Sequence, residues 1–284
     1  MNHIQENSII YEWSDVLNKL VPSEITLKYL NSSQITHGIT LQELWYILDE
    51  AWNELLKDPT TRNQNLSDFL FNYYQNPVWL INAAFSESDP NTINDRLSAI
   101  RLVSHVSPQK ILDFGGGIGT VSRLCAISLP YTEVIDLVDI TKFHNTVTQY
   151  LSSFSRIRIL IEPDPPYDAI ISTEVFEHLI DPIRAVYEIN LLLRIGGAFA
   201  GSWSFAPGIK CHLPQNFHLK RLMPWIIRSL GFGFYGFERR GSTVYGFVKH
   251  SHATPNMLKI ARFLGNLSRL PLPWDRLLLL LRGL

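Results

Sequence analysis

One stretch of the sequence joins a short apolar run, a cluster of glycines and a segment with helical composition. Lys110 to Phe114 has the side chains of a buried strand, Gly115 to Gly119 contains four glycines, and residues 119–129 follow with helical composition. Glycine adopts backbone angles that are closed to other residues and lets a ligand approach the main chain closely. The stretch therefore predicts a strand, a sharp turn and a helix, as at the beginning of an open α/β sheet.

Strands and helices are predicted to alternate over residues 108–250. Further strands are expected at residues 133–140, 156–161, 169–172 and 198–204. Further helices are expected at residues 143–151, 182–194 and 217–230. This alternation is typical of a mostly parallel, doubly wound sheet with helices on both faces. Two last strands, at 234–240 and 243–250, are separated only by a Gly241-Ser242 turn, so we expect a seven-stranded sheet whose last strand is antiparallel.

Residues 1–107 are predicted to form helices. Leu41 to Lys57 has apolar side chains at helical spacing, and Thr40 with Glu43 forms a capping-box pattern before it. Further helices are expected at residues 67–75 and from Pro90 onward. This part is rich in aromatic residues, including Trp45, Trp52, Tyr73, Tyr74 and Trp79. We therefore divide the chain into a helical part, residues 1–107, an alternating part, residues 108–250, and a tail, residues 251–284.

Composition excludes several classes of protein. The 284 residues carry a net charge of −1 and are 46% hydrophobic, which supports a sizeable core but not the basic excess typical of nucleic-acid binding. Cys125 and Cys211 alone make neither a disulfide framework nor a four-cysteine zinc site. No signal-peptide pattern opens the chain, and no apolar run approaches the ~18–20 residues of a membrane span. We therefore expect a cytoplasmic protein without a bound metal, whose oligomeric state the sequence leaves open.

An acid before the glycine loop separates two kinds of nucleotide cofactor. Dinucleotides prefer the pattern G-x-G-x-x-G, whereas here Gly115, Gly117 and Gly119 place the third glycine one residue early. Asp113 would also repel a pyrophosphate in a partly dry site. S-adenosylmethionine has no phosphate and carries a cationic sulfonium and an ammonium group, so it suits this loop better. A nicotinamide-dependent oxidoreductase and a non-catalytic cofactor-binding subunit are the alternatives.

A second acid is expected to bind the ribose of the cofactor. Asp139 lies at the end of the second predicted strand, about 20 residues after the glycine loop, as nucleotide-binding sheets require. One carboxylate accepts both hydrogen bonds of a ribose diol. Asp136 is the competing acid, but it lies further from the carboxyl end of the strand. Asp139 and the adjacent Ile140 are therefore the predicted cofactor contacts.

These motifs resemble those of class I S-adenosylmethionine-dependent methyltransferases over about residues 108–250. Asp113 to Gly119 looks like the first motif of that family. Tyr167 to Leu179 resembles its fourth-strand motif, in the subgroup with Glu-His-Leu followed by Asp-Pro. Leu193 to Gly197 resembles the Leu-Lys-Pro-Gly-Gly turn, with Ile195 in place of proline. The resemblance implies a Rossmann-like methyltransferase fold with an antiparallel last strand and S-adenosylmethionine as cofactor.

The resemblance also implies an acid that binds adenine after the third strand. Glu162 and Asp164 are candidates, but neither lies in a clear motif, so adenine recognition stays open. The segments Asn76 to Asn82 and Ile209 to Leu219 resemble parts of bacterial methyltransferases from surface-polysaccharide or secondary-metabolite contexts. This second resemblance implies a small molecule methylated on oxygen or nitrogen, such as a sugar or a natural-product intermediate in biosynthesis. The family resemblance also implies that the helices of residues 1–107 form a cap over the substrate opening of the S-adenosylmethionine-binding domain, residues 108–250. Acceptor identity and the methylated atom are not specified by the sequence.

Four side chains are candidates for the chemistry beside the cofactor. Glu174 is expected in the cofactor pocket, and His178, His212 and His218 are the catalytic candidates. Methyl transfer is an in-line displacement, so the protein mainly holds the nucleophile close and in line. A hydroxyl nucleophile also has to lose a proton, which suits an imidazole. The spacing of Cys211, His212 and His218 alone does not predict a metal site.

The tail, residues 251–284, is predicted to contain an amphipathic basic helix. Its apolar face is expected to include Ile260, Phe263, Leu264, Leu267 and Leu270. Its cationic residues are Lys259, Arg262, Arg269, Arg276 and Arg282. Such a helix either packs on protein or makes weak, reversible contact with an anionic membrane surface.

Overall fold

The computed structural model describes residues 9–61, 64–239 and 243–270. The strands within these ranges are β1 (Lys110–Phe114), β2 (Val134–Val138), β3 (Ile157–Leu160), β4 (Tyr167–Thr173), β5 (Leu193–Ser202), β6 (Phe232–Arg239) and β7 (Thr243–Lys249). The helices before the sheet are α1 (Trp13–Leu20), α2 (Ser23–Tyr29), α3 (Ser32–His37), α4 (Leu41–Lys57), α5 (Leu66–Tyr74), α6 (Trp79–Ser88) and α7 (Pro90–Ser104). The later helices are α8 (Thr120–Ser128), α9 (His144–Tyr150), α10 (Pro182–Leu192), α11 (Met223–Ser229) and α12 (Pro255–Leu267), with short 3₁₀ helices η1 (Phe176–His178) and η2 (Pro214–Arg221).

The strands form one seven-stranded sheet in the order β3-β2-β1-β4-β5-β7-β6. Strands β1 to β5 pair in parallel, whereas β7 pairs antiparallel with both β5 and β6. This confirms the predicted sheet and its antiparallel last strand. The strand order reverses between β1 and β4, and ligands of open α/β sheets bind at the carboxyl ends of the strands beside such a reversal.

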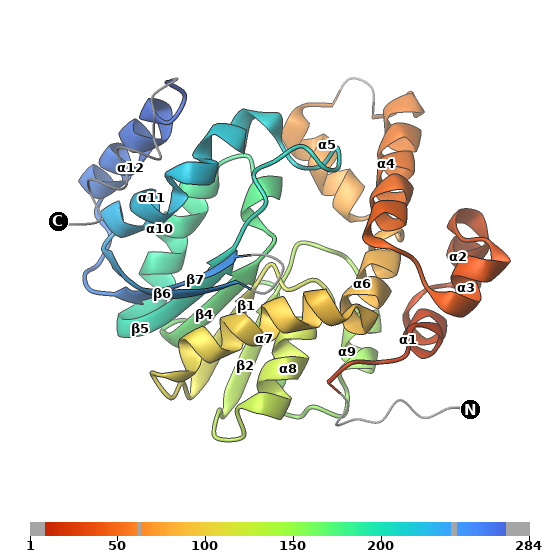
Figure 1. Ribbon diagram of the computed structural model, residues 1–284, viewed down its shortest axis with the longest axis horizontal. Coiled ribbons are helices and arrows are strands. Elements are labelled where there is room, and N and C mark those ends of the chain that lie inside the picture. Colours follow the sequence, from red (N-terminus) through yellow and green to blue (C-terminus); the bar gives the residue numbers. More distant parts are fainter. Residues whose placement is uncertain (1–8, 62–63, 240–242, 271–284) are drawn as a thin grey trace.

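Helices cover both faces of the sheet (Figure 1), and side chains on both faces are buried. On β1 and β4, Ile111 and Ile171 pack in one core with α7 and α8. Their neighbours Leu112 and Ile170 point to the opposite face, in a second core with α10, α11 and α12. Because successive strand residues alternate between faces and both faces are covered, these strands are continuously apolar.

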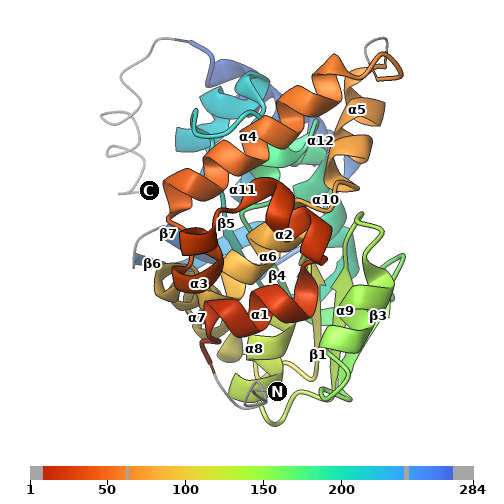
Figure 2. The same ribbon diagram turned by 90° about the vertical axis from the view of Figure 1, so that its right-hand side faces the viewer.

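The N-terminal helices share a third core with one side of the sheet. Leu17 of α1, Leu48 of α4 and Ile81 of α6 are buried in one cluster with Leu137 of β2 and Leu151 after α9. Figure 2 shows α1, α4 and α6 lying together on this side of the molecule. Helix α4 has the predicted bounds, and Thr40 and Glu43 form the predicted capping box. These helices are therefore packed against the elements that carry the glycine loop.

A fully buried ion pair joins α6 to α8. Arg123 Nη2 lies 2.5 Å from Glu87 Oε2, and both side chains have 0% exposure. Arg123 also donates to the carbonyl of Ile9 at 3.0 Å, and its guanidinium lies 4.2 Å from the centre of the Tyr11 ring. The pair fixes the N-terminal helices to the helix that directly follows the glycine loop.

Two predicted helices end or divide differently in the structure. The helix predicted over residues 182–194 ends at Leu192, because Leu193 already pairs with Tyr167 in the sheet. The helix predicted over 217–230 is divided into η2 and α11. Pro224 lies in the first turn of α11. Proline has no backbone N–H and is tolerated only at the beginning of a helix, so a new helix begins here.

The face that α12 buries agrees only in part with the predicted one, because Leu264 and Leu267 pack on the core as expected and other predicted residues do not. Leu258, Ala261 and Gly265 are buried, whereas Ile260 and Phe263 are 53% and 64% exposed. The small residues allow a close approach, since a Cβ on Gly265 would lie only 2.6 Å from Ile183 Cδ1. The predicted Gly241-Ser242 turn, Arg276 and Arg282 lie outside the described residues. In the part of the chain that the structure describes, no helix is both long and apolar enough to cross a bilayer.

Candidate active site

The glycine loop after β1 lies at the carboxyl edge of the sheet. Gly115, Gly117 and Gly119 have φ angles of 71°, 58° and 86°, which L side chains rarely adopt. Gly115 donates its backbone N–H to the carbonyl of Val138 at the end of β2, at 2.9 Å. A Cβ on Gly117 would meet no atom within 4 Å, so the loop is open to a ligand at this position.

Asp139 lies directly beside this loop. Its Oδ2 accepts the backbone N–H of Gly117 at 2.8 Å, and its Oδ1 accepts that of Thr141 at 2.9 Å. A carboxylate has about four lone-pair positions, so two remain for the hydroxyls of a ribose. The next residue, Ile140, is 60% exposed and its carbonyl accepts from Gln75 Nε2 at 2.9 Å. The structure thus places both predicted contacts at the open edge.

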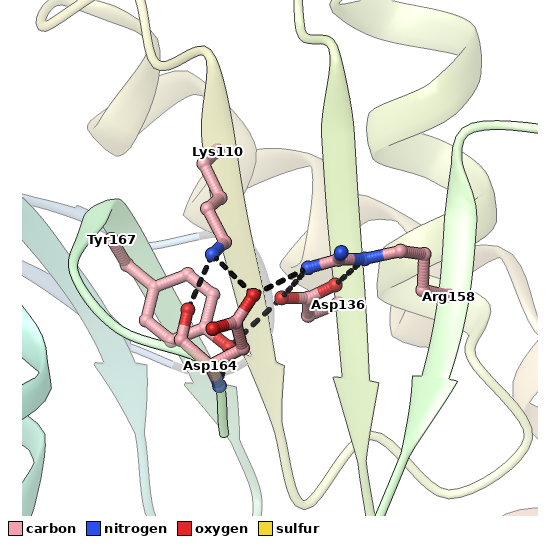
Figure 3. Close-up of polar contacts among 5 residues, drawn as sticks. All are labelled: Lys110, Asp136, Arg158, Asp164 and Tyr167. Atoms are coloured by element: carbon pink, nitrogen blue, oxygen red, sulfur yellow. Dashed lines mark hydrogen bonds and ion pairs between the residues drawn. The ribbon is translucent and has the colours of Figure 1, made fainter. Parts of the chain in front are cut away.

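The competing acid Asp136 is enclosed on the sheet. Its carboxylate accepts from Arg158 Nε at 2.7 Å and from the Tyr167 hydroxyl at 2.9 Å, and it has no exposed surface (Figure 3). Asp164, a candidate for adenine, forms an ion pair with Lys110, the first residue of β1 (Figure 3). Since Lys110 lies at the amino end of β1, Asp164 lies at the amino ends of the strands, away from the glycine loop. The other candidate, Glu162, is exposed in the segment after β3.

Asp113 lies behind the loop. It is 2% exposed, and its Oδ2 accepts both the N–H and the hydroxyl of Ser122 in the first turn of α8. A Cβ on Gly116 would lie 2.4 Å from Asp113 Cγ, so carboxylate and loop are in direct contact. Burial raises the pKa of Asp113 to about 6, although the two Ser122 hydrogen bonds oppose the rise. Asp113 therefore organises the loop, and its direct contact with a cofactor stays a prediction.

The raised pKa of Asp113 predicts a pH-dependent stability. Between its ordinary pKa of 3.8 and about 6, the folded chain binds a proton that the unfolded chain has lost, so stability falls as pH rises through this window. Asp113→Asn removes this titration. From about pH 4 to about pH 7, wild type should lose roughly 3 kcal/mol of unfolding free energy relative to the variant. Urea denaturation at several pH values checks this, and parallel profiles for the two proteins would contradict it.

Glu174 follows β4 in a strained backbone conformation. Its φ is 56°, and its Oε1 accepts from the Ser202 hydroxyl at the end of β5 at 2.6 Å. Non-glycine residues with such angles cluster at functional sites. Burial lowers the pKa of Arg96 on α7, and the charges of nearby carboxylates oppose that change, Glu174 most strongly, followed by Asp95, Asp113 and Glu87. The edge of the sheet thus combines two acids with one cation.

Three further side chains converge beside Glu174. Glu177, His178 and His212 each place one ligand atom within 4.8 Å of the other two. The rings of His178 and His212 have centres 5.0 Å apart. Val175, two residues before Glu177, packs against the glycine loop, since a Cβ on Gly115 would lie 2.8 Å from its Cγ2. The structure therefore brings His178 and His212 together next to the glycine loop.

Aromatic rings from the N-terminal helices cover this cluster. The ring centres of Tyr74 and Trp79 lie 6.0 and 6.2 Å from that of His178. Burial and, to a smaller extent, the charge of His212 lower the pKa of His178 to about 3, so the imidazole is neutral at neutral pH. Burial, and then the charge of Glu174, raise the pKa of Glu177 well above its ordinary range.

His218 is not part of this cluster. It lines a separate pocket of about 170 Å³ between η2 and α12, together with Asp181, Arg262 and Arg269. Burial and the charge of Arg269 lower its pKa. His212 and His218 are close in sequence, but the segment that joins them turns their side chains toward different helices.

The sequence did not indicate roles for Arg96 and Glu177, and it indicated Tyr74 only as one of several aromatic residues of the cap. Arg96 lies between the buried residues Ile93 and Ile100 on the apolar side of its helix. A charged residue at such a position indicates a functional role and could have been noticed in the sequence. Glu177 belongs to the Glu-His-Leu motif and is fully buried, but burial is not visible in the motif. Tyr74 is one of several clustered aromatic residues, and the sequence does not distinguish a core ring from one above a site.

Comparisons with known proteins agree with this geometry. Residues 87–225 match the sequence profile of a family described as a methyltransferase domain. The chain is similar to human N-acetylserotonin methyltransferase in complex with SAM, with 17% identity over 83% of this chain and 67% of that chain, and a TM-score of 0.45. It is also similar to PigF with SAH, with 17% identity over 74% and 71% and a TM-score of 0.43. No curated protein matches the sequence.

The matched residues include the glycine loop, Asp139 and the Glu-His-Leu segment. Together with the sheet order, they define a class I methyltransferase domain. The protein is an S-adenosylmethionine-dependent methyltransferase, and S-adenosylmethionine is its methyl donor. The methyltransferase interpretation is thus confirmed over the oxidoreductase alternative.

Asp139→Ala should weaken binding of S-adenosylhomocysteine by roughly 1–3 kcal/mol, because hydrogen bonds to a charged group are lost. Asp139→Asn is the matched variant: its amide oxygen still accepts the Gly117 N–H but offers fewer positions to a diol. Calorimetric titration of both variants checks this. Unchanged affinity in both variants would show that the ribose contact lies elsewhere.

Gly117→Val should weaken binding of S-adenosylhomocysteine more than Asp139→Ala does, because the valine side chain fills the open position beside the loop. The same titration measures this. Normal binding by a folded Gly117→Val variant would show that the glycine loop has only a structural role.

Proposed function

We propose that the enzyme methylates an oxygen atom of a small molecule. The observation that carries this proposal is the convergence of Glu177, His178 and His212 next to the glycine loop. A hydroxyl nucleophile must give up a proton, and these side chains offer acceptors for it, whereas amine and carboxylate nucleophiles need none. The rings of Tyr74 and Trp79 above His178 favour a small, enclosed acceptor.

The residues at the sheet edge fit S-adenosylmethionine. The cofactor supplies a methyl group on sulfonium, which is already a good leaving group, so the protein contributes mainly position. We assign the ribose to Asp139, with Ile140 beside it, and the open main chain to Gly117. Arg96 suits the α-carboxylate of the cofactor, and Glu174 suits its ammonium group, since opposite charges within a partly buried site attract strongly.

The N-terminal helices are proposed to cover the acceptor site, as a cap of residues 1–107 on a domain of residues 108–250. Three contacts support this role. Gln75 after α5 donates to the carbonyl of Ile140 at 2.9 Å. The segment after β5 docks on α4: Lys210 N donates to Asp49 Oδ1 at 2.8 Å, and Gly208 lies against the ring of Trp45.

A panel of acceptors tests the proposed function. The enzyme is incubated with S-adenosylmethionine carrying a labelled methyl group and with matched phenols, sugar alcohols, amines and carboxylic acids. Label should pass to hydroxyl acceptors and remain in the product after alkaline treatment, because ethers resist alkali and methyl esters do not. Transfer only to amines or carboxylic acids would overturn the proposal of oxygen methylation.

The surroundings of the enzyme are also proposed. Free, buried Cys125 and Cys211 suit a reducing compartment, and we place the enzyme in the cytoplasm. The net charge of −1 gives no basic excess for a nucleic-acid partner.

Helix α12 is proposed to serve in protein packing rather than in membrane binding. It buries Leu258 and Ala261 against α10 and α11, and Arg262 forms an ion pair with Asp181 at 2.7 Å. The chain should therefore stay in the supernatant when sedimented with anionic vesicles. Sedimentation that weakens in salt and disappears in Ile260→Ser/Phe263→Ser would support membrane contact instead.

A further inference from the structure

We infer that Glu177, His178 and His212 form the binding site of one divalent transition-metal ion. The inference departs from the sequence-based expectation of no metal, which considered only the spacing of Cys211, His212 and His218. Its catalytic role rests on the proposed function, but metal binding itself does not. Both imidazoles and one carboxylate come from segments at the carboxyl edge of the sheet, after β4 and after β5.

Both imidazoles are oriented as metal-binding histidines usually are. Nδ1 of His178 lies 3.2 Å from the carbonyl of Cys211, and Nδ1 of His212 lies 3.0 Å from that of Ala206. A carbonyl accepts only from a protonated nitrogen, so Nδ1 carries the proton and Nε2 presents its lone pair. Within the described ranges, no hydrogen bond reaches either Nε2. A backbone carbonyl that fixes the second nitrogen is the common arrangement around bound metals.

Glu177 supplies a buried oxygen that has no partner. Its side chain has 0% exposure, and one oxygen, Oε1, accepts the N–H of Ser204 at 3.1 Å. The other, Oε2, has no hydrogen-bond partner among the described residues. Buried polar atoms without partners are rare, and a missing ion is one explanation for them. A proton shared with the nearby Glu174 is the competing explanation.

The separations and the donor set suit a small cation. Ligand atoms about 2.1 Å from a tetrahedral metal are about 3.4 Å apart, so separations of up to 4.8 Å close with small side-chain rotations. Two imidazoles with one carboxylate bind Zn²⁺ and similar transition metals and leave a coordination position open. Tyr74 and Trp79 form the apolar shell that limits access of water.

The open position would hold the oxygen of the acceptor. A cation there lowers the pKa of a hydroxyl that contacts it, so the proton leaves to solvent at neutral pH. The oxygen lone pair then forms the new O–CH₃ bond, the S–CH₃ bond breaks, and its electron pair stays on sulfur as S-adenosylhomocysteine leaves. No oxidant or reductant is needed. Glu177, His178 and His212 therefore orient the acceptor through the metal.

Metal binding is tested on the full-length enzyme after treatment with a chelator. Zn²⁺ is titrated calorimetrically, and Co²⁺ is added to follow its visible absorption bands. We expect one ion per chain. His212→Ala and Glu177→Gln should weaken binding at least about 100-fold, since losing even an outer-shell partner costs 10- to 100-fold. His218→Ala is the matched control, because this histidine faces a different pocket, and it should bind the ion as wild type does.

The outcomes separate this inference from the proposed function. Circular dichroism and binding of S-adenosylhomocysteine show that each variant is folded. Absence of Zn²⁺ and Co²⁺ binding to wild type, or equal loss in His218→Ala, overturns the metal site and favours a proton shared by Glu174 and Glu177. If hydroxyl acceptors are still methylated in that case, the proposed function stands. Metal binding without oxygen methylation would confirm the metal site and overturn only its proposed role in methyl transfer.

Discussion

His212→Ala should lower turnover by about 10²–10⁴-fold while binding of S-adenosylhomocysteine survives. The expected loss is that of a group that holds or deprotonates the nucleophile, whether directly or through a bound cation. Cofactor binding should survive because His212 is held by the carbonyl of Ala206 and the ring of His178, whereas the glycine loop is held by Asp113, Asp139 and Val138. Steady-state turnover on the best hydroxyl acceptor, with calorimetric titration of S-adenosylhomocysteine, measures both quantities.

His218→Ala in the same assay separates the two histidines that the sequence left as alternatives. His218 lines the pocket under α12, so its replacement should change turnover far less than that of His212. A larger loss in His218→Ala would place the acceptor under α12. Equal loss of turnover and cofactor binding in His212→Ala would mark His212 as structural.

Glu87→Gln should lower the free energy of unfolding by about 3–5 kcal/mol, because it leaves the charge of Arg123 buried without its counter-ion. Neither side chain of this pair reaches solvent, so water cannot replace the lost partner. The variant should also loosen α6 from α8, since the pair joins these two helices. Chemical denaturation at neutral pH, followed by far-ultraviolet circular dichroism, measures the change.

Two comparisons make this prediction specific. Glu87→Leu/Arg123→Met removes both charges and should recover much of the loss, because a buried pair replaced by apolar groups is often near neutral. Glu54→Gln breaks the ion pair with Lys28, whose side chains are 46% and 49% exposed, and should cost less than about 1 kcal/mol. A similar loss of unfolding free energy in Glu87→Gln and Glu54→Gln would show that the buried ion pair stabilises the fold no more than an exposed one.

The cofactor side of the fold was predictable because its signals are local. The glycine loop, Asp139 and the antiparallel last strand can each be predicted from a short segment, because the conformation of the chain there restricts which residues can occur. Helix α4 was predicted to its bounds because Thr40 and Glu43 cap it and Asp58-Pro59 follows it. Boundaries set by tertiary pairing were predicted less well: β5 begins at Leu193 because the neighbouring strand offers Tyr167 as a partner.

The acceptor side was less predictable because its residues meet only in three dimensions. His178 and His212 lie after different strands, and no sequence spacing shows that they converge. Arg96 comes from a helix that precedes the sheet, and its distance to Glu174 depends on how α7 crosses β4 and β5. The buried face of α12 was predicted only in part. Leu264 and Leu267 pack on the core as predicted, but periodicity marks large apolar residues and does not show that Ala261 and Gly265 decide how closely the helices approach.

The segment that carries His212 is attached to α4 at one end and to the sheet at the other. Lys210 contacts Asp49 through its backbone and Asn53 through its side chain, both on α4. Under the proposed function, selectivity for the acceptor is therefore encoded in two parts of the gene that are far apart, the N-terminal helices and the segment after β5. Exchange of α1 to α6 between related enzymes should then redirect substrate choice and leave Arg96 and the glycine loop in place, provided that the residues of α4 facing Lys210 stay matched to it.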